Sequence, residues 1–130
     1  MKKSQAERFR ALAKQHDLIQ DDFWKASQGF VIITRTGIEK VQRSLGIEVK
    51  YEVVSEFSDV SVGLYVVKAI GYNKDKQVES FGEASPKNCR NAYPVAMAEK
   101  RALSRVILKM ADMYELGVYS EDEGDFKRDE

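Results

Sequence analysis

The stretch that decides the fold reads IEVKYEV from Ile47 to Val53, where apolar and charged side chains alternate. A period of two is typical of a strand that buries one face. The next run, residues 62–72, is apolar on both faces, which favours a central strand covered on both sides. A polar turn at 73–76 leads to a shorter strand at 77–81. These patterns predict three consecutive antiparallel strands.

A long helix is predicted after the strands, because residues 95–114 contain no glycine or proline. At 100° per residue one face carries Leu103, Ile107 and Met110. We expect this face to be buried against Tyr51, Leu64 or Val66 of the sheet. The opposite face carries Arg101, Arg105, Lys109 and Asp112 and is expected to be exposed.

Two shorter helices are predicted before the strands. A capping-box pattern at 4–7 begins an amphipathic helix over 5–16, and a second box at 36–39 begins a helix that ends at Gly46. A short β-prone run, residues 30–33, lies between them. The sequence therefore predicts an α+β fold in which an antiparallel β-β-β sheet is packed by a long C-terminal helix and preceded by two shorter helices. We expect one domain over 1–117 and an acidic mobile tail over 118–130.

Composition narrows the class of protein. The chain has 130 residues, a formal net charge of zero and no run of 18 apolar residues, so we expect no membrane contact. The N-terminus lacks an apolar segment, so a cytoplasmic location is expected. Cys89 is the one cysteine of the sequence, which excludes an internal disulfide and a multi-cysteine metal site. His16 is the one histidine, which excludes a multi-histidine metal centre. Cys89 lacks a nearby histidine base, and residues 82–85 lack a phosphate-loop lysine. We therefore expect no enzyme activity and no cofactor.

The charge is unevenly distributed along the chain. Residues 84–113 hold six basic and two acidic side chains, whereas residues 114–130 hold two basic and seven acidic ones. A concentrated basic segment can neutralise a row of phosphates, although it can also be a solvated helix face. The candidate nucleic-acid-binding residues are Lys87, Arg90, Lys100, Arg101, Arg105 and Lys109.

The aromatic residues and the acidic segment each leave more than one interpretation open. Aromatic residues near the sheet could stack on bases or fill the core; these are Tyr65, Tyr72, Phe81 and Tyr93. The acidic segment 121–125 could bind a partner, mimic DNA or be a solvated tail, and its spacing does not match a calcium loop.

The predicted sheet leads through Phe81-Gly82-Glu83-Ala84-Ser85 into a helix that reads AMAEKRALSR at 96–105. This arrangement resembles the single-strand annealing proteins. These are the phage and eukaryotic recombination annealases, which include the Erf and Red beta types. The resemblance spans about residues 47–123. It implies a β-β-β-α core, binding of single-stranded DNA in recombination or repair of a phage or mobile element, and annealing without nucleotide hydrolysis. It also implies that Lys100, Arg101 and Arg105 lie near the DNA backbone.

A second resemblance is to the double-stranded-RNA-binding domain, which has the order α-β-β-β-α and a basic start to its last helix. Residues 85–92 are similar to that start. A third hypothesis, from a different class, is a structural or interaction protein that docks a partner through its helix or acidic tail. Binding to nucleic acid would separate this hypothesis from the first two by its steep salt dependence.

Self-association is expected from two apolar side chains on the helix. Met97 and Leu108 fall on the polar side of the helical wheel, beside Arg101. They could be scattered exposed side chains, which are common on protein surfaces. If a neighbouring subunit covers them instead, the chain would form a homo-oligomer, as a ring or as a filament.

Overall fold

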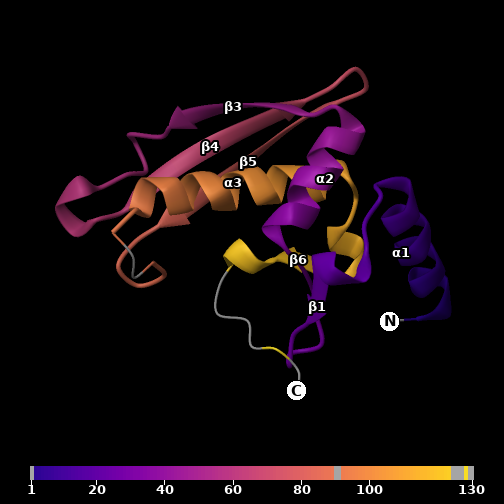
Figure 1. Ribbon diagram of the computed structural model, residues 1–130. Helices are drawn as coiled ribbons and strands as arrows, with labels where there is room; N and C mark the ends of the chain where they lie inside the picture. The colour runs from indigo at the N-terminus through magenta and orange to yellow at the C-terminus, as the bar shows by residue number, and fades with distance from the viewer. Residues whose placement is uncertain (1, 90–91, 124–127, 129–130) are drawn as a thin grey trace.

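The computed structural model describes residues 2–89, 92–123 and 128. Within these residues the chain is α+β, as predicted, with three α-helices and two three-stranded sheets. Figure 1 shows helix α3 between the larger sheet and the smaller elements near the two termini. In that described part, no helix is both long enough and apolar enough to cross a membrane.

The larger sheet contains the three predicted strands. Its order is β3 (Glu48–Val53), β4 (Tyr65–Tyr72) and β5 (Gln77–Ala84), and both pairs are antiparallel. The 3₁₀ helix η2 (Val60–Val62) replaces the first residues of the predicted second strand. The β4–β5 turn is held by Asn73, whose side-chain oxygen accepts hydrogen bonds from the backbone N–H groups of Asp75 and Lys76.

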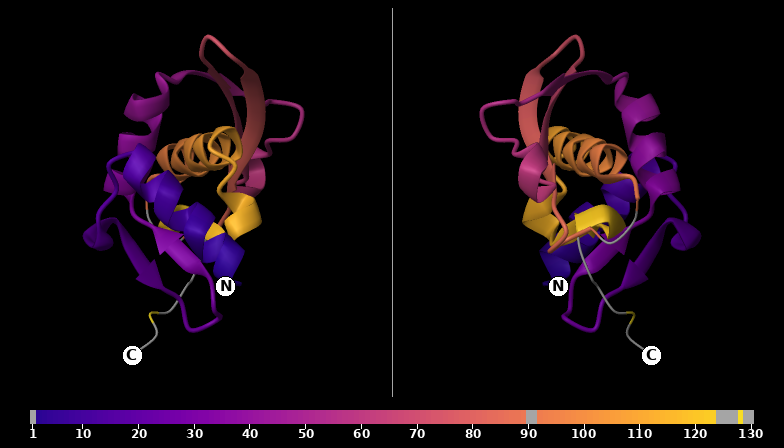
Figure 2. Two further views of the ribbon diagram at one scale, coloured as in Figure 1. Left: turned by 90° about the vertical axis from the view of Figure 1, so that its right-hand side faces the viewer. Right: turned by 90° about the vertical axis from the view of Figure 1, so that its left-hand side faces the viewer.

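One face of this sheet packs against α3 (Pro94–Met110). The buried face of β4 carries Val67, Ala69 and Gly71. This face packs against the core side of α3. Leu103, Ile107 and Met110 are buried, as predicted. The expected partners were partly wrong, because Leu64 and Val66 lie outside the strand face that the helix covers. No α-helix of the described residues covers the opposite face of the larger sheet (Figure 2). On that face of β4, Lys68, Ile70 and Tyr72 are partly exposed.

The surface of α3 differs from the prediction because the helix is covered on more than one side. It also contacts α2 (Arg35–Leu45) and strand β6 (Val118–Ser120). Leu108 is fully buried, and Met97 is half-buried and packs against the core. The expectation that these two side chains form an exposed apolar pair is therefore wrong, and self-association needs a different basis.

The smaller sheet joins distant parts of the sequence. Strand β1 (Phe23–Lys25) pairs antiparallel with β2 (Val31–Ile33), and β2 pairs parallel with β6. Helix α1 (Lys3–Gln15) packs beside them, with the ring centroids of Phe9 and Phe23 5.0 Å apart. The 3₁₀ segments η1 (Gln20–Asp22), η3 (Tyr114–Leu116) and η4 (Glu121–Glu123) complete the described elements.

The predicted boundary at residue 117 is wrong, because the acidic tail begins inside the folded domain. Strand β6 is part of the smaller sheet, and η4 follows it directly. The backbone N–H of Arg35, at the start of α2, donates to Glu121 Oε1 at 3.0 Å. Residues 118–123 are thus fixed against α2 and α3. Residues 124–127, 129 and 130 of the predicted tail lie outside the described residues.

Candidate nucleic-acid interface

Arg101, expected on an exposed basic face, is inside the protein. It is 5% exposed. Its guanidinium donates to the carbonyl oxygens of Glu83 at 2.8 Å, Asn88 at 2.6 Å and Asp122 at 2.9 Å, and to Asn88 Oδ1 at 3.1 Å. These acceptors come from β5, from the loop before α3 and from η4. Arg101 therefore joins three segments of the fold, and its expected exposure is wrong.

Arg105 has carboxylates as its main partners. Its guanidinium donates to both carboxylate oxygens of Glu123, at 2.9 Å each, and to both of Glu83, at 3.0 and 3.1 Å. It also donates to the carbonyl oxygen of Phe81 at 2.7 Å. The hydrogen bonds that Arg105 donates to Glu123, opposed by burial and reinforced by Glu83, raise the pKa of Arg105 above its ordinary value. With its donors used in this way, Arg105 is not the exposed cation that the sequence suggested.

The acidic residues of η4 complete this cluster. Asp122 Oδ2 accepts hydrogen bonds from the hydroxyls of Ser104 at 3.1 Å and Ser120 at 3.3 Å. Glu123 Oε1 also accepts from the hydroxyl of Tyr114 at 3.3 Å, and burial, together with the nearby Glu123 charge, raises the pKa of Tyr114. Among the described residues no group of acidic, histidine or cysteine side chains could hold a metal ion. In this cluster the acidic residues bind arginines of the same chain.

The remaining candidate cations do not form one row. Lys87, Lys100 and Lys109 are exposed, and Arg90 lies outside the described residues. Lys100 and Lys109 are nine positions apart, which places them about 180° apart around α3. The exposed candidate lysines of α3 therefore do not lie along one row. Lys87 lies in the loop before α3, and Lys100 lies two turns into the helix.

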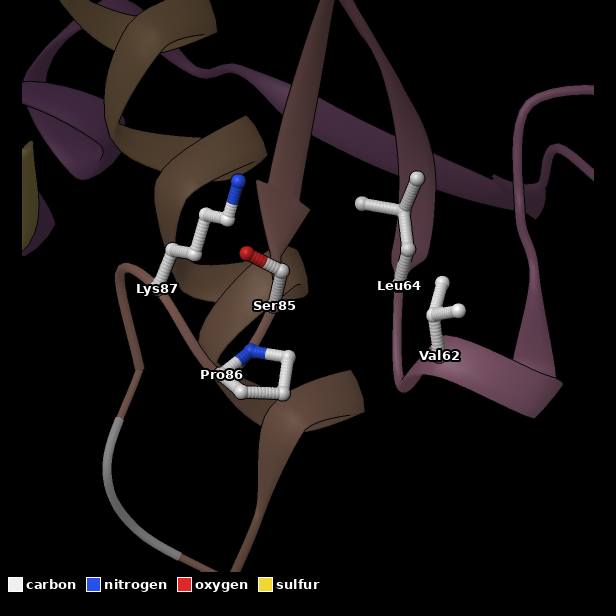
Figure 3. Close-up of a pocket in the computed structure, with 5 residues that line it drawn as sticks. All are labelled: Val62, Leu64, Ser85, Pro86 and Lys87. Atoms are coloured by element: carbon white, nitrogen blue, oxygen red, sulfur yellow. The ribbon is translucent and has the colours of Figure 1, made fainter.

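An apolar surface lies at the same end of the domain. A cleft of about 470 Å³ opens between η2 with β4 on one side and the loop after β5 on the other. Figure 3 shows Val62 and Leu64 on one wall, with Ser85, Pro86 and Lys87 opposite. Large apolar side chains are also exposed in and just before η2 and at the start of α3, namely Phe57, Val60, Val62, Tyr93 and Val95.

Tyr93 is the aromatic residue at this end that is best placed to meet a ligand. It is 68% exposed and is the N-cap residue of α3. Lys100 follows seven positions later and therefore projects from the same side of the helix, about 10 Å along its axis. Of the other candidate aromatics, Tyr65 and Tyr72 are half-buried, and the exposed ring of Phe81 packs edge-on against Phe57 with centroids 6.4 Å apart.

Asn88 was not identified from the sequence, although it organises the loop that carries Lys87. Its Oδ1 accepts from the backbone N–H of Ser85 at 2.8 Å and from Arg101. The signal that could have revealed it is the Ser85-Pro86-Lys87-Asn88 turn, since asparagine at a turn commonly bonds a nearby backbone group. Cys89 is half-buried and packs against the core.

Comparison with known proteins finds no match, because no family model, no curated protein and no solved structure is significantly similar to this chain. The resemblance to the annealases stays a prediction, and the case for function depends on the residues themselves.

Proposed function

We propose that this chain binds single-stranded DNA, without catalysing a reaction, and acts in recombination or repair of the phage or mobile-element type. The observation that carries the proposal is that Lys87 is exposed at the rim of an apolar cleft, while Tyr93 and Lys100 are exposed on the helix that follows this loop. In the described part of the chain neither lysine forms an ion pair.

Each group has a distinct task in this proposal. The lysine ammonium groups neutralise phosphates, which gives affinity without sequence preference. The ring of Tyr93 stacks on an unpaired base, and such stacking contributes roughly 1–3 kcal/mol per base. Duplex DNA keeps its bases stacked inside the helix, so the tyrosine discriminates in favour of single strands.

Annealing of complementary strands and assembly into rings or filaments are further parts of the proposal. One domain offers few phosphate contacts, and several domains along one strand would multiply them. A strand-annealing assay with complementary labelled oligonucleotides tests this part separately from binding.

Binding to double-stranded RNA is the second candidate function. The order α2-β3-β4-β5-α3 supports it, because it is the α-β-β-β-α order of the double-stranded-RNA-binding domain. The exposed Tyr93 favours the single-strand hypothesis instead, since an A-form duplex offers no unpaired base to stack on. A third outcome, no binding to any nucleic acid, would leave a structural or interaction protein.

The test is a titration of labelled single-stranded DNA, duplex DNA and duplex RNA at two salt concentrations. We expect the tightest binding to single-stranded DNA. Each phosphate contact on a single strand contributes about 0.7 to the slope of log affinity against log salt. The variant Lys87→Glu/Lys100→Glu should therefore flatten that slope by about 1.4.

Two matched variants separate charge from stacking. Lys109→Glu changes the opposite side of α3 and should leave the slope near that of the wild type. Tyr93→Ala should weaken binding while leaving the slope unchanged, because stacking releases no counterions. The site is wrong if Lys109→Glu weakens binding as much as the Lys87/Lys100 variant does. Preferential binding to duplex RNA would favour the second candidate.

A further inference from the structure

Among the described residues, strand β3 forms an edge of the larger sheet that pairs with no further strand. The backbone N–H of Val54 donates to the carbonyl oxygen of Val66 at 2.8 Å, so the N–H of Val54 is directed towards β4. Bonded and non-bonded pairs alternate along an antiparallel ladder. Given the register in which Glu52 faces Lys68, the backbone groups of Glu48, Lys50 and Glu52 are directed towards β4. Those of Val49, Tyr51 and Val53 are directed away from the sheet.

The side chains leave this edge accessible. All residues of β3 except Val49 are exposed, and Tyr51 and Val53 are 39% and 68% exposed. The strand contains no proline and no bulge, two of the devices that keep an edge from pairing with another chain. Charged side chains, a third such device, alternate with apolar ones along it. The edge therefore offers outward-directed backbone donors and acceptors, with apolar side chains on one face and charged side chains on the other.

The sequence of β3 is complementary to itself in one antiparallel register. Pairing Tyr51 with Tyr51 of a second copy sets Lys50 opposite Glu52 of that copy, and Glu52 opposite its Lys50. In the same register Val49 lies opposite Val53. Cross-strand pairs of opposite charge and apolar pairs each stabilise an antiparallel ladder.

Neighbouring registers are unfavourable. A shift by one position would align outward-directed backbone groups with groups already bonded to β4, because the pattern alternates at every residue. A shift of the pairing by two positions would set Lys50 opposite Lys50 of the second copy or Glu52 opposite Glu52. Like charges directly opposite each other are destabilising. Charge and backbone geometry thus select the register centred on Tyr51.

We propose that a second copy of this chain docks on β3, in an antiparallel arrangement centred on Tyr51, and joins the two larger sheets into one continuous sheet. The contact is isologous, so it closes as a two-fold dimer. Glu52 already contacts Lys68 with its oxygen 3.4 Å from Nζ, but Lys68 also has Glu79 at 4.0 Å. Glu52 can therefore turn to the second copy while Lys68 keeps a partner. This interface is separate from the proposed DNA site and does not depend on it.

The test is the oligomeric state, measured by sedimentation across a range of protein concentrations. The wild type should be in monomer–dimer equilibrium. Lys50→Glu and Glu52→Lys each place like charges opposite in two symmetric pairs, and each should raise the dimer dissociation constant by about tenfold or more. The double variant Lys50→Glu/Glu52→Lys restores both opposite-charge pairs with the signs exchanged, so it should dimerise like the wild type.

Lys14→Glu, on the exposed side of α1, makes the same charge change away from β3 and should leave dimerisation unaffected. Circular dichroism of each variant shows whether it is folded. We expect every variant to fold, because the side chains of Lys50 and Glu52 are exposed. A double variant as monomeric as the single ones would overturn the proposal. So would a wild type that stays monomeric at every concentration, an outcome that would direct attention to a peptide of another protein as the occupant of the edge.

Discussion

The two edges of the larger sheet are treated differently by the rest of the molecule. At the β5 edge the carbonyl oxygens of Phe81 and Glu83 accept hydrogen bonds from Arg105 and Arg101. At the β3 edge, no side chain of the described residues forms a hydrogen bond with the outward backbone groups of Val49, Tyr51 or Val53. Exposed edges are templates for pairing with other chains. One edge is closed by guanidinium groups, and the other stays available.

The comparison explains why the arginines of α3 are not simply a cationic surface. A guanidinium has five donors in a planar fork, so it can bond several acceptors at once. Arg101 and Arg105 use these donors to hold the edge strand, the following loop and η4 against the helix. The charge of Arg105 is balanced by Glu83 and Glu123, and the buried guanidinium of Arg101 is held by neutral oxygen acceptors. The DNA proposal therefore depends on the exposed lysines.

Removing an arginine that bonds the β5 edge should have the largest effect on the free energy of unfolding. Arg101→Ala leaves the carbonyl oxygens of Glu83, Asn88 and Asp122 without their buried donor. Because a buried acceptor left without a partner costs roughly 1–3 kcal/mol, the variant should lower the free energy of unfolding by about 3 kcal/mol or more. The neighbouring Lys100→Ala is the control, because Lys100 is exposed and should change stability by less than about 0.5 kcal/mol. Urea denaturation measures both, and similar losses in the two variants would contradict the structural role of Arg101.

A smaller loss is expected from moving α3 away from the closed edge. A Cβ atom at Gly82 would collide with the backbone oxygen of Ala98 and the backbone nitrogen of Ala102. Gly82→Ala should therefore force the helix outward and lower the unfolding free energy by about 1–3 kcal/mol. Gly71→Ala meets side-chain atoms of Val106 and Met110 instead of the helix backbone, and a side chain shifts at lower cost than a backbone, so its loss should be smaller. A larger loss for Gly71→Ala in thermal or urea unfolding would refute the close approach at Gly82.

The smallest expected effect is a pH dependence of the stability, which arises from His16 and from neither edge of the larger sheet. His16 is buried, with Nδ1 2.8 Å from the hydroxyl oxygen of Ser44, and burial lowers its pKa below 6.5. The unfolded chain therefore binds the proton more readily, and stability should fall as the pH drops through the range below 6.5. His16→Gln should reduce this fall, measured by unfolding at pH 7.5 and at pH 5.5 in the same buffer. An unchanged fall would contradict the assignment of this pH dependence to His16.

The strands could be predicted from the sequence because burial on one side leaves a local trace. The alternation from Ile47 to Val53 and the turn at Asn73 are both visible within a few residues, and the structure places β3 and the β4–β5 turn there. The inward face of α3 was predicted correctly for the same reason, since Leu103, Ile107 and Met110 recur at helical spacing.

The rest of α3 could not be predicted from its own pattern. A helical wheel assumes one buried face, but α3 is covered by the larger sheet, by α2 and by β6, so Leu108 and Arg101 are buried as well. The partners of Arg101 are mainly backbone carbonyls, which every residue has, and no residue type marks them. Glu123 and Arg105 are opposite charges 18 positions apart, a separation at which the sequence alone does not indicate contact.

The contrast between the two edges is tested most directly by amide hydrogen exchange at low and at high protein concentration. We predict that the amides of Val49, Tyr51 and Val53 exchange more slowly as concentration rises, because each donates to the second copy in the dimer. The amides of Lys50 and Glu52, already bonded to β4, and those of Phe81 and Glu83 on the closed edge should not change with concentration. Concentration-independent exchange at Val49, Tyr51 and Val53, or added protection along β5 instead, would contradict the account.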